Sequence, residues 1–600
     1  MKRTALSFTL LALLGSQVNA QIGTGGLPLS IQTGKASDAV PVVNAALPDW
    51  ENGLQEWEKQ PGARPYLVAL NTPLEVAFPG SGTFSTTENG TKVWRVQINV
   101  AGAPAIGLYY DHFRLPEGVK LYLSNASGKQ ILGAYTDANN SPSSEFATEA
   151  IQGGLVNLEL NIESGVDIAG INLHINKAAT YFRGIEYLQS FKGDLQFIDA
   201  YDDALTGRSS VCMINAICPE GNNYVNQRNA AFQWLIPVGQ GVGACSATMI
   251  NSTGNTGSTC KQYFLLASHC DGSNATTNAA FNQVLLRYNF QHATCNPAAG
   301  TIPGTTKTLT GANFLSRSIV NVNDPANIKG DFLLMETRSA IPESWNVNLA
   351  GWNNAANIPT TQAAPKKFIG FHHPGGDAKK VSSSQQIQSY SLGTAESHWA
   401  TILATGLVAQ GSSGSALFDG DGRVIGVASV AGAGQGVPAN CNLDALGNNV
   451  AASTSNTVLY SKLSYDWDYN VDGSTNSSKL KPWLDPANTG ATTTNTVKST
   501  CAPLSGSTAI TNSNKLDDGI ALFPNPSSTG KVTLKLNLNE ATDLYMDLYD
   551  VTGKKVNSYS LKKVSSGSFG LDLSQYANGM YLLQLSDGYH KTSKKIMLAK

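Results

Sequence analysis

The cysteines are the sequence feature that most constrains how this chain can fold. Seven of the eight cysteines lie between residues 212 and 441, and the eighth is Cys501. Their spacings are wide and contain no paired C-x-x-C knuckles, so neither a zinc site nor any other metal site is expected. In an exported protein such cysteines are more often disulfides. We therefore expect one compact, disulfide-bonded unit in this interval.

The N-terminus indicates that the chain is exported. Lys2 and Arg3 precede the apolar run 5–14, and Val18-Asn19-Ala20 resembles a small-residue cleavage site. This is the pattern of a secretory signal peptide over residues 1–20, which is too short to span a bilayer. Because no later segment holds an uninterrupted apolar run of spanning length, no transmembrane segment is expected in the mature chain.

The remaining composition indicates several mostly β domains. A chain of 600 residues is too long for one hydrophobic core. Short apolar runs recur between turn-forming residues, which is typical of strands. The net charge is −2 and 14% of residues are charged, so no nucleic-acid partner is expected.

The organisation along the chain follows from composition and periodicity. Residues 21–208 lack cysteine. In the runs at 93–100, 119–123 and 155–160, apolar and polar residues alternate with period two, which predicts a sandwich with one solvent-exposed face. No reactive constellation lies there, so a propeptide that assists folding or inhibits is favoured over an independent binding module. Residues 209–490 carry the motifs described next.

Two segments follow the cysteine-rich unit. Residues 491–517, which begin with a Thr/Asn/Ser-rich stretch, are predicted to be a flexible linker. Residues 518–600 are predicted to form a small β-sandwich with strands at 531–538, 544–551, 568–573 and 580–585. No plausible nucleophile pair lies in it, so its role should be structural, adhesive or for addressing.

Three motifs carry a possible chemistry. His269 follows the apolar run 264–267, Asp331 begins a buried strand, and Ser413 lies in Gly411-Ser412-Ser413-Gly414-Ser415. A serine hydroxyl is a weak nucleophile and needs an imidazole base, which in turn needs an anion to fix its tautomer. We predict that these three residues form a catalytic triad. The amides of Gly411 and Ser413 would form the oxyanion hole.

The order of these residues discriminates between hydrolase layouts. The α/β-hydrolase elbow requires glycine at position 415 and a histidine after the nucleophile, and the only later histidine is His590. The subtilisin order needs an acid before His269, and no suitable motif is present. The order His, Asp, Ser belongs to the two-barrel chymotrypsin-like class. Asp324 is the second choice of acid, but Pro325 and the lack of an apolar run make it typical of a turn.

Residues from about 209 to 487 resemble the secreted bacterial lysyl endopeptidases, which are chymotrypsin-like serine proteases. The motifs that carry this resemblance are Ile217–Gly221, Phe264–Cys270, Asn289-Phe290-Gln291, Asp331–Leu334, Ala350-Gly351-Trp352, His372-His373-Pro374, Gly411–Ala416 and Trp483–Gly490. The resemblance implies a double β-barrel with the active site between the barrels. It also implies the triad His269, Asp331 and Ser413.

The resemblance further implies three disulfides and a substrate strand. The disulfides are Cys212–Cys441, Cys218–Cys295 and Cys245–Cys270. Cys260 and Cys501 remain, and they either pair with each other or stay free. Ser429 matches the serine that supports the triad aspartate, and Val430 and Ala431 would follow as the strand along which an extended substrate pairs.

The specificity residues depart from the family pattern. Where the family has an acid in its specificity pocket, this chain has Ser453 or a near neighbour. The positions of the family's supporting histidine and tryptophan are Ser429 and Leu392. The position of a trypsin-type pocket acid is Leu407. A buried lysine without a countercharge is costly. We therefore expect an apolar or small side chain before the cleaved bond. Asp444 is close enough in sequence to supply an acid, which keeps lysine specificity as an alternative.

Activation and export also have sequence signals. Mammalian chymotrypsin-like proteases have an aspartate just before the nucleophile, which pairs with the newly cut N-terminus, but this chain has Ser412 there. We therefore expect activation by removal of the segment before Ser209, with the cut at Gly207-Arg208-Ser209. An apolar-specific enzyme would not cut there itself, so another protease is expected to act. Residues before 208 resemble the family's pro-region.

The last eighty residues resemble the C-terminal sorting domain of the type IX secretion system in Bacteroidota. The carrying motifs are Leu522–Pro526, Leu548–Lys554, Leu571–Ser574, Gly579-Met580-Tyr581 and Lys594-Lys595-Ile596. The resemblance implies transit across the outer membrane by the secretion machinery. Removal of this module, with release or attachment at the cell surface, would follow.

These observations predict a secreted serine endopeptidase that hydrolyses extracellular proteins or peptides through an acyl-enzyme. The chemistry requires no cofactor. A true lysyl endopeptidase is the first alternative. A surface adhesin or binding protein on an inactive protease scaffold is the second.

Overall fold

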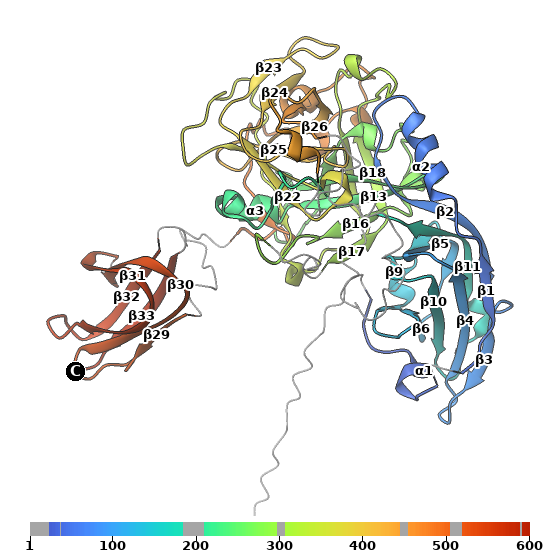
Figure 1. Ribbon diagram of the computed structural model, residues 1–600, viewed down its shortest axis with the longest axis horizontal. Helices are drawn as coiled ribbons and strands as arrows, with labels where there is room; N and C mark the ends of the chain where they lie inside the picture. Colours follow the sequence, from blue (N-terminus) through green and yellow to red (C-terminus); the bar gives the residue numbers. More distant parts are fainter. Residues whose placement is uncertain are drawn as a thin grey trace, which may run out of the picture. The chain divides into compact units, whose positions relative to one another are not determined.

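The computed structural model describes residues 23–35, 38–183, 209–296, 306–443, 454–504, 519–551, 553–587 and 591–600. The chain divides into two compact units, Met1–Ala502 and Pro503–Lys600. Strands dominate both units, as Figure 1 shows. The expected signal peptide, 1–20, lies outside the described residues.

The N-terminal part of the first unit is a sandwich of two sheets. One sheet contains β1 (Val42–Ala45), β3 (Thr83–Thr86), β4 (Lys92–Val100), β6 (Val119–Asn125), β7 (Ile131–Tyr135) and β10 (Leu155–Ile162). The other contains β2 (Tyr66–Ala77), β5 (Ala105–Arg114), β8 (Phe146–Ala147), β9 (Ile151–Gln152) and β11 (Asn172–Tyr181). Ile98 from β4, Ile106 from β5 and Ile175 from β11 are fully buried in the core between them. The period-two alternation of apolar residues therefore produces a sandwich.

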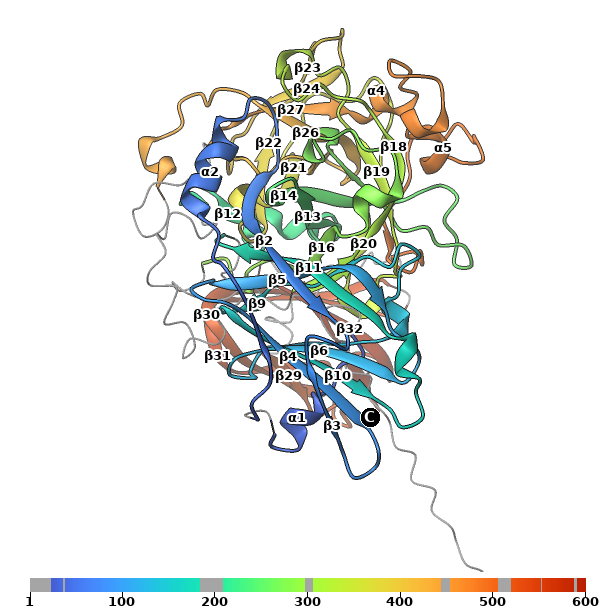
Figure 2. The same cartoon turned by 90° about the vertical axis from the view of Figure 1, so that its right-hand side faces the viewer.

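The second sheet continues into the first barrel of the protease region. This barrel consists of β13 (Ala231–Val238), β14 (Gly241–Ile250), β15 (Tyr263–Leu266), β16 (Leu285–Tyr288), β17 (Lys307–Thr310), β18 (Ala312–Arg317) and β19 (Leu333–Thr337). β2 pairs antiparallel with β14, which joins the sandwich and the barrel strands into one twelve-stranded sheet. Figure 2 shows β2, in blue, passing from the N-terminal strands to β14.

The second barrel is an eight-stranded sheet. Its order is β12 (Ile214–Asn215), β22 (Lys380–Ser384), β21 (Phe368–His372), β25 (Ala416–Phe418), β26 (Val424–Ala431), β27 (Thr457–Lys462), β24 (His398–Ile402) and β23 (Gln388–Tyr390). Short helices α4 (Leu463–Trp467) and α5 (Lys481–Leu484) follow β27. The chain thus has the mostly β, two-barrel architecture of chymotrypsin-like proteases.

Four disulfides cross-link the protease region. The structure contains Cys212–Cys441, Cys218–Cys295 and Cys245–Cys270, and it also joins Cys260 to Cys501, the pair that the sequence left open. This last bridge holds residues 491–502, which the sequence assigned to a flexible linker, against the protease region. β28 (Val497–Lys498) pairs with β20 (Asn348–Leu349), and Thr494 N donates to Trp352 O at 2.9 Å. Backbone hydrogen bonds of this kind do not depend on side-chain polarity, so a polar composition alone does not predict flexibility.

The C-terminal unit is a five-stranded antiparallel sheet around its own core. Its strands are β29 (Ile520–Phe523), β30 (Lys531–Asp550), β31 (Lys555–Asp572), β32 (Gly579–Ser586) and β33 (Lys591–Leu598). The first half of β30 pairs with β29 and its second half with β32. Leu534, Leu548 and Leu583 are fully buried in this core.

Candidate active site

His269 lies in a short turn that several contacts hold in place. β15 ends at Leu266 and the chain enters the 3₁₀ turn Ser268–Cys270, whose last residue is bonded to Cys245 of β14. Arg317, at the end of β18, donates to Ser268 O at 2.8 Å and to Asp271 Oδ2 at 2.5 Å. Because Arg317 and Asp271 are almost completely buried, this ion pair fixes the turn that presents the imidazole.

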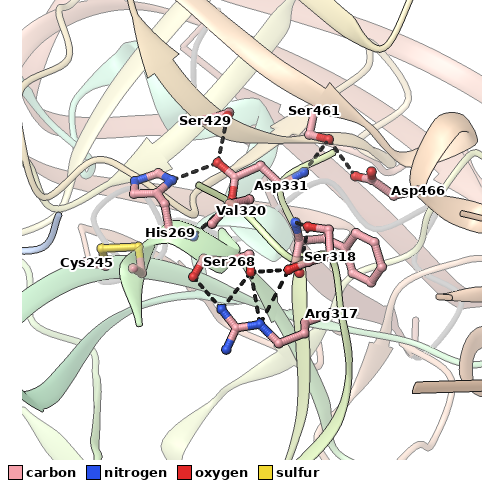
Figure 3. A network of polar contacts seen from close by, with 12 residues as sticks. Cys245, Ser268, His269, Arg317, Ser318, Val320, Asp331, Ser429, Ser461 and Asp466 are labelled. Carbon is pink, nitrogen blue, oxygen red and sulfur yellow. Dashed lines mark hydrogen bonds and ion pairs between the residues drawn. A yellow bond between two sulfur atoms is a disulfide. The ribbon is translucent and has the colours of Figure 1, made fainter. Parts of the chain in front are cut away.

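Asp331 is the hydrogen-bond partner of His269. Its carboxylate is fully buried and accepts from His269 N at 3.1 Å and from His269 Nδ1 at 2.7 Å (Figure 3). Burial alone would raise the pKa of Asp331, but the charge of His269 and the hydrogen bonds from His269 and Ser429 hold that pKa below its ordinary value. Asp331 is therefore an anion that orients the ring through Nδ1. Asp324, the second choice of acid, instead accepts from Asn327 Nδ2 at 2.7 Å in an exposed turn.

Ser429 and Ser461 complete the surroundings of Asp331. Ser429 Oγ donates to Asp331 Oδ2 at 2.6 Å. The pairing of β26 with β27 shifts register between Ala428 and Val430, and such a bulge re-aims the side chain of the extra residue. Behind the dyad, Ser461 Oγ accepts from Asp331 N at 3.0 Å and donates to Asp466 Oδ2 at 2.8 Å. Burial, together with the charge of Asp331, raises the pKa of Asp466 well above its ordinary value despite the hydrogen bond from Ser461.

Ser413 lies on a loop that packs against β14 and the histidine turn. Ser246 N donates to Ser413 O at 2.8 Å, and Ser246 Oγ donates to Gly411 O at 2.8 Å. Gly414 has a φ of +85°, and a Cβ there would lie 2.3 Å from Ser246 O and 3.0 Å from Ala267 N. The loop can therefore approach the histidine turn only because residue 414 is glycine.

The hydroxyl of Ser413 and the two predicted oxyanion amides have no hydrogen-bond partner among the described residues. Among the described residues no hydrogen bond joins Ser413 Oγ to the imidazole of His269, so that contact stays a prediction; catalytic hydrogen bonds often tighten only when substrate binds. The amides of Gly411 and Ser413 have no acceptor within the part of the chain that the structure describes. Both are thus available to an oxyanion.

A small pocket adjoins Ser413. It has a volume of about 30 Å³ and is lined by Val408, Ala409, Ser412, Ser413, residues 428–431 and Val458. No acid lines it among the described residues. Val430 and Ala431 pair with β27 on one side, and no described strand pairs with them on the other.

Leu407 and Leu392 are not among the described residues that line this pocket, but each packs in a cluster that adjoins it. Leu407 is buried in a cluster with Tyr66 and Cys441, which also contains the pocket residue Ala409. Leu392 packs in a second small cluster beside Val320, and Val430 of the pocket packs against the same cluster. Ser453 and Asp444 lie outside the described residues.

Several supporting residues escaped sequence reasoning. Arg317, Ser246, Ser461 and Asp466 have no motif of their own. Arg317, Ser246 and Ser461 contact residues far away in the chain, and Asp466 reaches the network only through Ser461. His372 Nδ1 lies 2.8 Å from Ser412 Oγ, which braces the serine loop. The His372-His373 pair was noted as a family motif, and this was the one available signal.

One group of side chains outside the protease region has metal-ligand chemistry. Asp111, His112 and His174 bring ligand atoms within 4.8 Å of one another. His174 also bonds Glu75, with Nε2 at 2.8 Å from Oε2 and Nδ1 at 2.6 Å from Asp111 Oδ1. Each nitrogen of His174 thus already has a carboxylate partner, and these ion pairs explain the cluster without a metal.

The fold is that of the chymotrypsin-like class, and the family match identifies its protease region as a serine endopeptidase. Residues 206–447 match the family model described as "Lysyl endopeptidase, C-terminal domain", and residues 521–599 match "Secretion system C-terminal sorting domain". The chain therefore carries a lysyl endopeptidase-type protease domain and a sorting domain of the type IX secretion system, and it is a secreted protein. No helix in the described ranges is long and apolar enough to cross a membrane.

Two solved structures are similar at low identity. The protease Anisep from Arthrobacter nicotinovorans is 12% identical over 40% of this chain and 91% of its own, with a TM-score of 0.25. The secreted serine protease VesC from Vibrio cholerae is 11% identical over 62% of this chain and 68% of its own, with a TM-score of 0.24.

Proposed function

We propose that residues 209–490 hydrolyse peptide bonds in extracellular proteins through His269, Asp331 and Ser413. The observation that carries the proposal is the buried network in which Asp331 accepts from His269 Nδ1 at 2.7 Å and from Ser429 at 2.6 Å. With Nδ1 engaged as a donor, Nε2 is left to act as the base.

The proposed reaction has two halves. Ser413 Oγ attacks the carbonyl carbon while His269 Nε2 accepts its proton, and the amides of Gly411 and Ser413 stabilise the oxyanion. His269 then protonates the leaving amine, which leaves an acyl-enzyme on Ser413. Water, deprotonated by the same imidazole, releases the acyl group. Asp331 stabilises the imidazolium in each half.

We propose further that the cleaved bond follows a small or apolar side chain. The volume of about 30 Å³ and the apolar walls at Val408, Ala428 and Val458 support this. Lysine specificity is the second candidate, because the matched family is named for lysyl endopeptidases and Asp444 lies outside the described residues.

Cleavage of a denatured protein by the processed enzyme separates these candidates. Mass spectrometry of the products gives the residue before each cut. Cuts after Ala, Val or Ser support the small, apolar pocket. Cuts confined to lysine would discard it and assign the countercharge to the segment that contains Asp444, which Asp444→Asn would then test.

Activation by removal of residues 21–208 has local support. Ser209 N lies 3.1 Å from Asp377 Oδ2, and Asp377 is largely buried beside Lys380. A cut after Arg208 would place the new N-terminal ammonium group of Ser209 against this carboxylate. The negative charge of Asp377 would stabilise the charged ammonium group. N-terminal sequencing of the secreted form tests the proposal, and a mature start far from Ser209 would contradict it.

The sorting domain, residues 518–600, is proposed to leave the protein after export, with release or attachment at the cell surface. Its compact core, separate from the first unit, supports independent removal. The intact mass of the protein recovered from medium and from washed cells tests this proposal, and retention of the domain in both fractions would contradict it.

A further inference from the structure

The N-terminal region contributes a strand beside the catalytic serine. In the pairing of β2 with β14, Tyr66 lies opposite Ala244, and Leu70 lies opposite Gly241. The next residues of β14 are at the active site, since Cys245 is bonded to Cys270 and Ser246 N donates to Ser413 O. β2 therefore begins next to the catalytic residues and runs away from them along the edge of β14.

The residues before β2 cross the active site. Ala63 N donates to Val322 O at 2.9 Å, and Val322 packs against the same small cluster as Val430 of the proposed substrate strand. Gln410, which precedes the oxyanion residue Gly411, donates from Nε2 to Arg64 O at 3.2 Å. Residues 63–66 thus pass from the β26 side, beside the oxyanion loop, to the β14 side.

The direction of this path is that of a substrate. A peptide that pairs with Val430 and Ala431 before the scissile bond must leave Ser413 on the β14 side, as the chain does from Ala63 to Tyr66. We infer that residues 62–70 occupy the leaving-group half of the cleft as an intramolecular inhibitor. The freed edge of β14 would then bind the substrate residues that follow the scissile bond, by strand addition. This inference rests on the proposed function.

The inhibitory segment does not offer a side chain to the pocket. The guanidinium of Arg64 donates to Glu58 O at 2.9 Å and to Gln60 O, and it lies 5.8 Å from the ring centroid of Trp57. Glu58 and Trp57 belong to α2 (Trp50–Lys59). Arg64 is thereby held on the helix and is not among the residues that line the pocket.

Two glycines of β14 shape the edge for this backbone. A Cβ on Gly241 would lie 2.0 Å from Ala69 O, and a Cβ on Gly243 would lie 2.5 Å from Pro65 Cγ. The nearest atom outside the N-terminal region to that second Cβ is Val238 Cγ1, at an ordinary 3.6 Å. Alanine at position 243 would therefore collide with the inhibitory segment and leave the barrel itself without a clash.

The test uses the unprocessed full chain, verified by its intact mass, and an internally quenched peptide with residues on both sides of the cleaved bond. We expect wild type to cleave it at least about tenfold more slowly than the processed enzyme. Gly243→Ala should bring the unprocessed chain to within about threefold of the processed enzyme that carries the same substitution, because overpacking displaces the segment. Gly239→Ala is the matched control, since a Cβ there meets no atom within 4 Å.

Hydrogen exchange at residues 66–71 reports whether the pairing itself is lost, and Gly241→Ala provides a second variant if Gly243→Ala folds poorly. Faster exchange together with faster cleavage supports the inference. Fast exchange without faster cleavage overturns it, and unchanged exchange contradicts the packing on which it stands. If the unprocessed wild type is as active as the processed enzyme, residues 62–70 do not inhibit, while the proposed peptidase function stands. If neither form cleaves any peptide, the proposed function fails and takes this inference with it.

Discussion

The two sides of Ser413 are built from different contacts. On the acid–base side, Asp331 accepts three hydrogen bonds from His269 and Ser429, and Arg317 is paired with Asp271. On the binding side, the pocket is lined mainly by alanine and valine. Proton transfer needs a fixed orientation, which buried polar contacts supply, whereas selectivity needs only space of the right size. Changes on the first side should therefore abolish activity, and changes on the second should redirect it.

Asp331→Asn, on the acid–base side, should reduce activity the most. An amide of the same shape can donate to Nδ1 and so favours the wrong imidazole tautomer, and kcat should fall by about 10⁴-fold. Active-site titration and steady-state kinetics on a peptide substrate measure it. A loss below tenfold would show that Asp331 does not orient His269.

Arg317→Met should affect folding more than chemistry. It leaves the carboxylate of Asp271 buried without its ion-pair partner, which costs about 3–5 kcal/mol of unfolding free energy. Urea unfolding of the processed enzyme measures the change. Lys366→Met, which breaks an exposed ion pair with Asp421, is the control and should shift the midpoint little. Equal shifts in the two variants would contradict a structural role for the buried pair.

Ala428→Val should redirect cleavage on the binding side. Added methyl groups in a pocket of about 30 Å³ exclude larger side chains, with a discrimination of about 1–3 kcal/mol. The ratio of kcat/KM for peptides with Ala and Val before the cleaved bond should rise about tenfold or more in favour of Ala. An unchanged ratio would place the specificity pocket elsewhere.

The smallest effect is expected at Asp466. Its raised pKa means that the folded chain binds this proton more tightly than the unfolded chain, so the stabilisation is full below about pH 3.9 and is lost as pH rises. Asp331, whose pKa is lowered, has the opposite sign and loses its contribution as pH falls. Asp466→Asn should therefore raise Tm relative to wild type more at pH 8 than at pH 4. A larger gain at pH 4 would contradict a protonated Asp466.

The residues that can be predicted from the sequence are those that lie in local motifs. His269 and Ser413 are predicted because an apolar strand precedes the first and glycines flank the second. The order of the three residues selects the two-barrel architecture. The alternation in 93–100 predicted a sheet whose residues are now seen in a sandwich core. Patterns of this kind are local, so the sequence alone displays them.

Features that depend on distant contacts were not predictable. The partners of Arg317 and the bond between Cys260 and Cys501 join residues far apart in the chain. Counting back from the serine predicts Leu407 near the pocket, but it does not reveal that Leu407 packs with the distant residues Tyr66 and Cys441. Gly241 and Gly243 look like ordinary strand glycines until the approach of β2 is known.

The central claim is that His269, Asp331 and Ser413 act as one proton relay. The most direct measurement is the rate at which a fluorophosphonate modifies the processed enzyme, with the modified residue located by peptide mapping. We predict modification at Ser413 alone, and a rate that falls at least about 10³-fold in His269→Ala while the fold is retained. Modification at another serine, or an undiminished rate in His269→Ala, would contradict the relay.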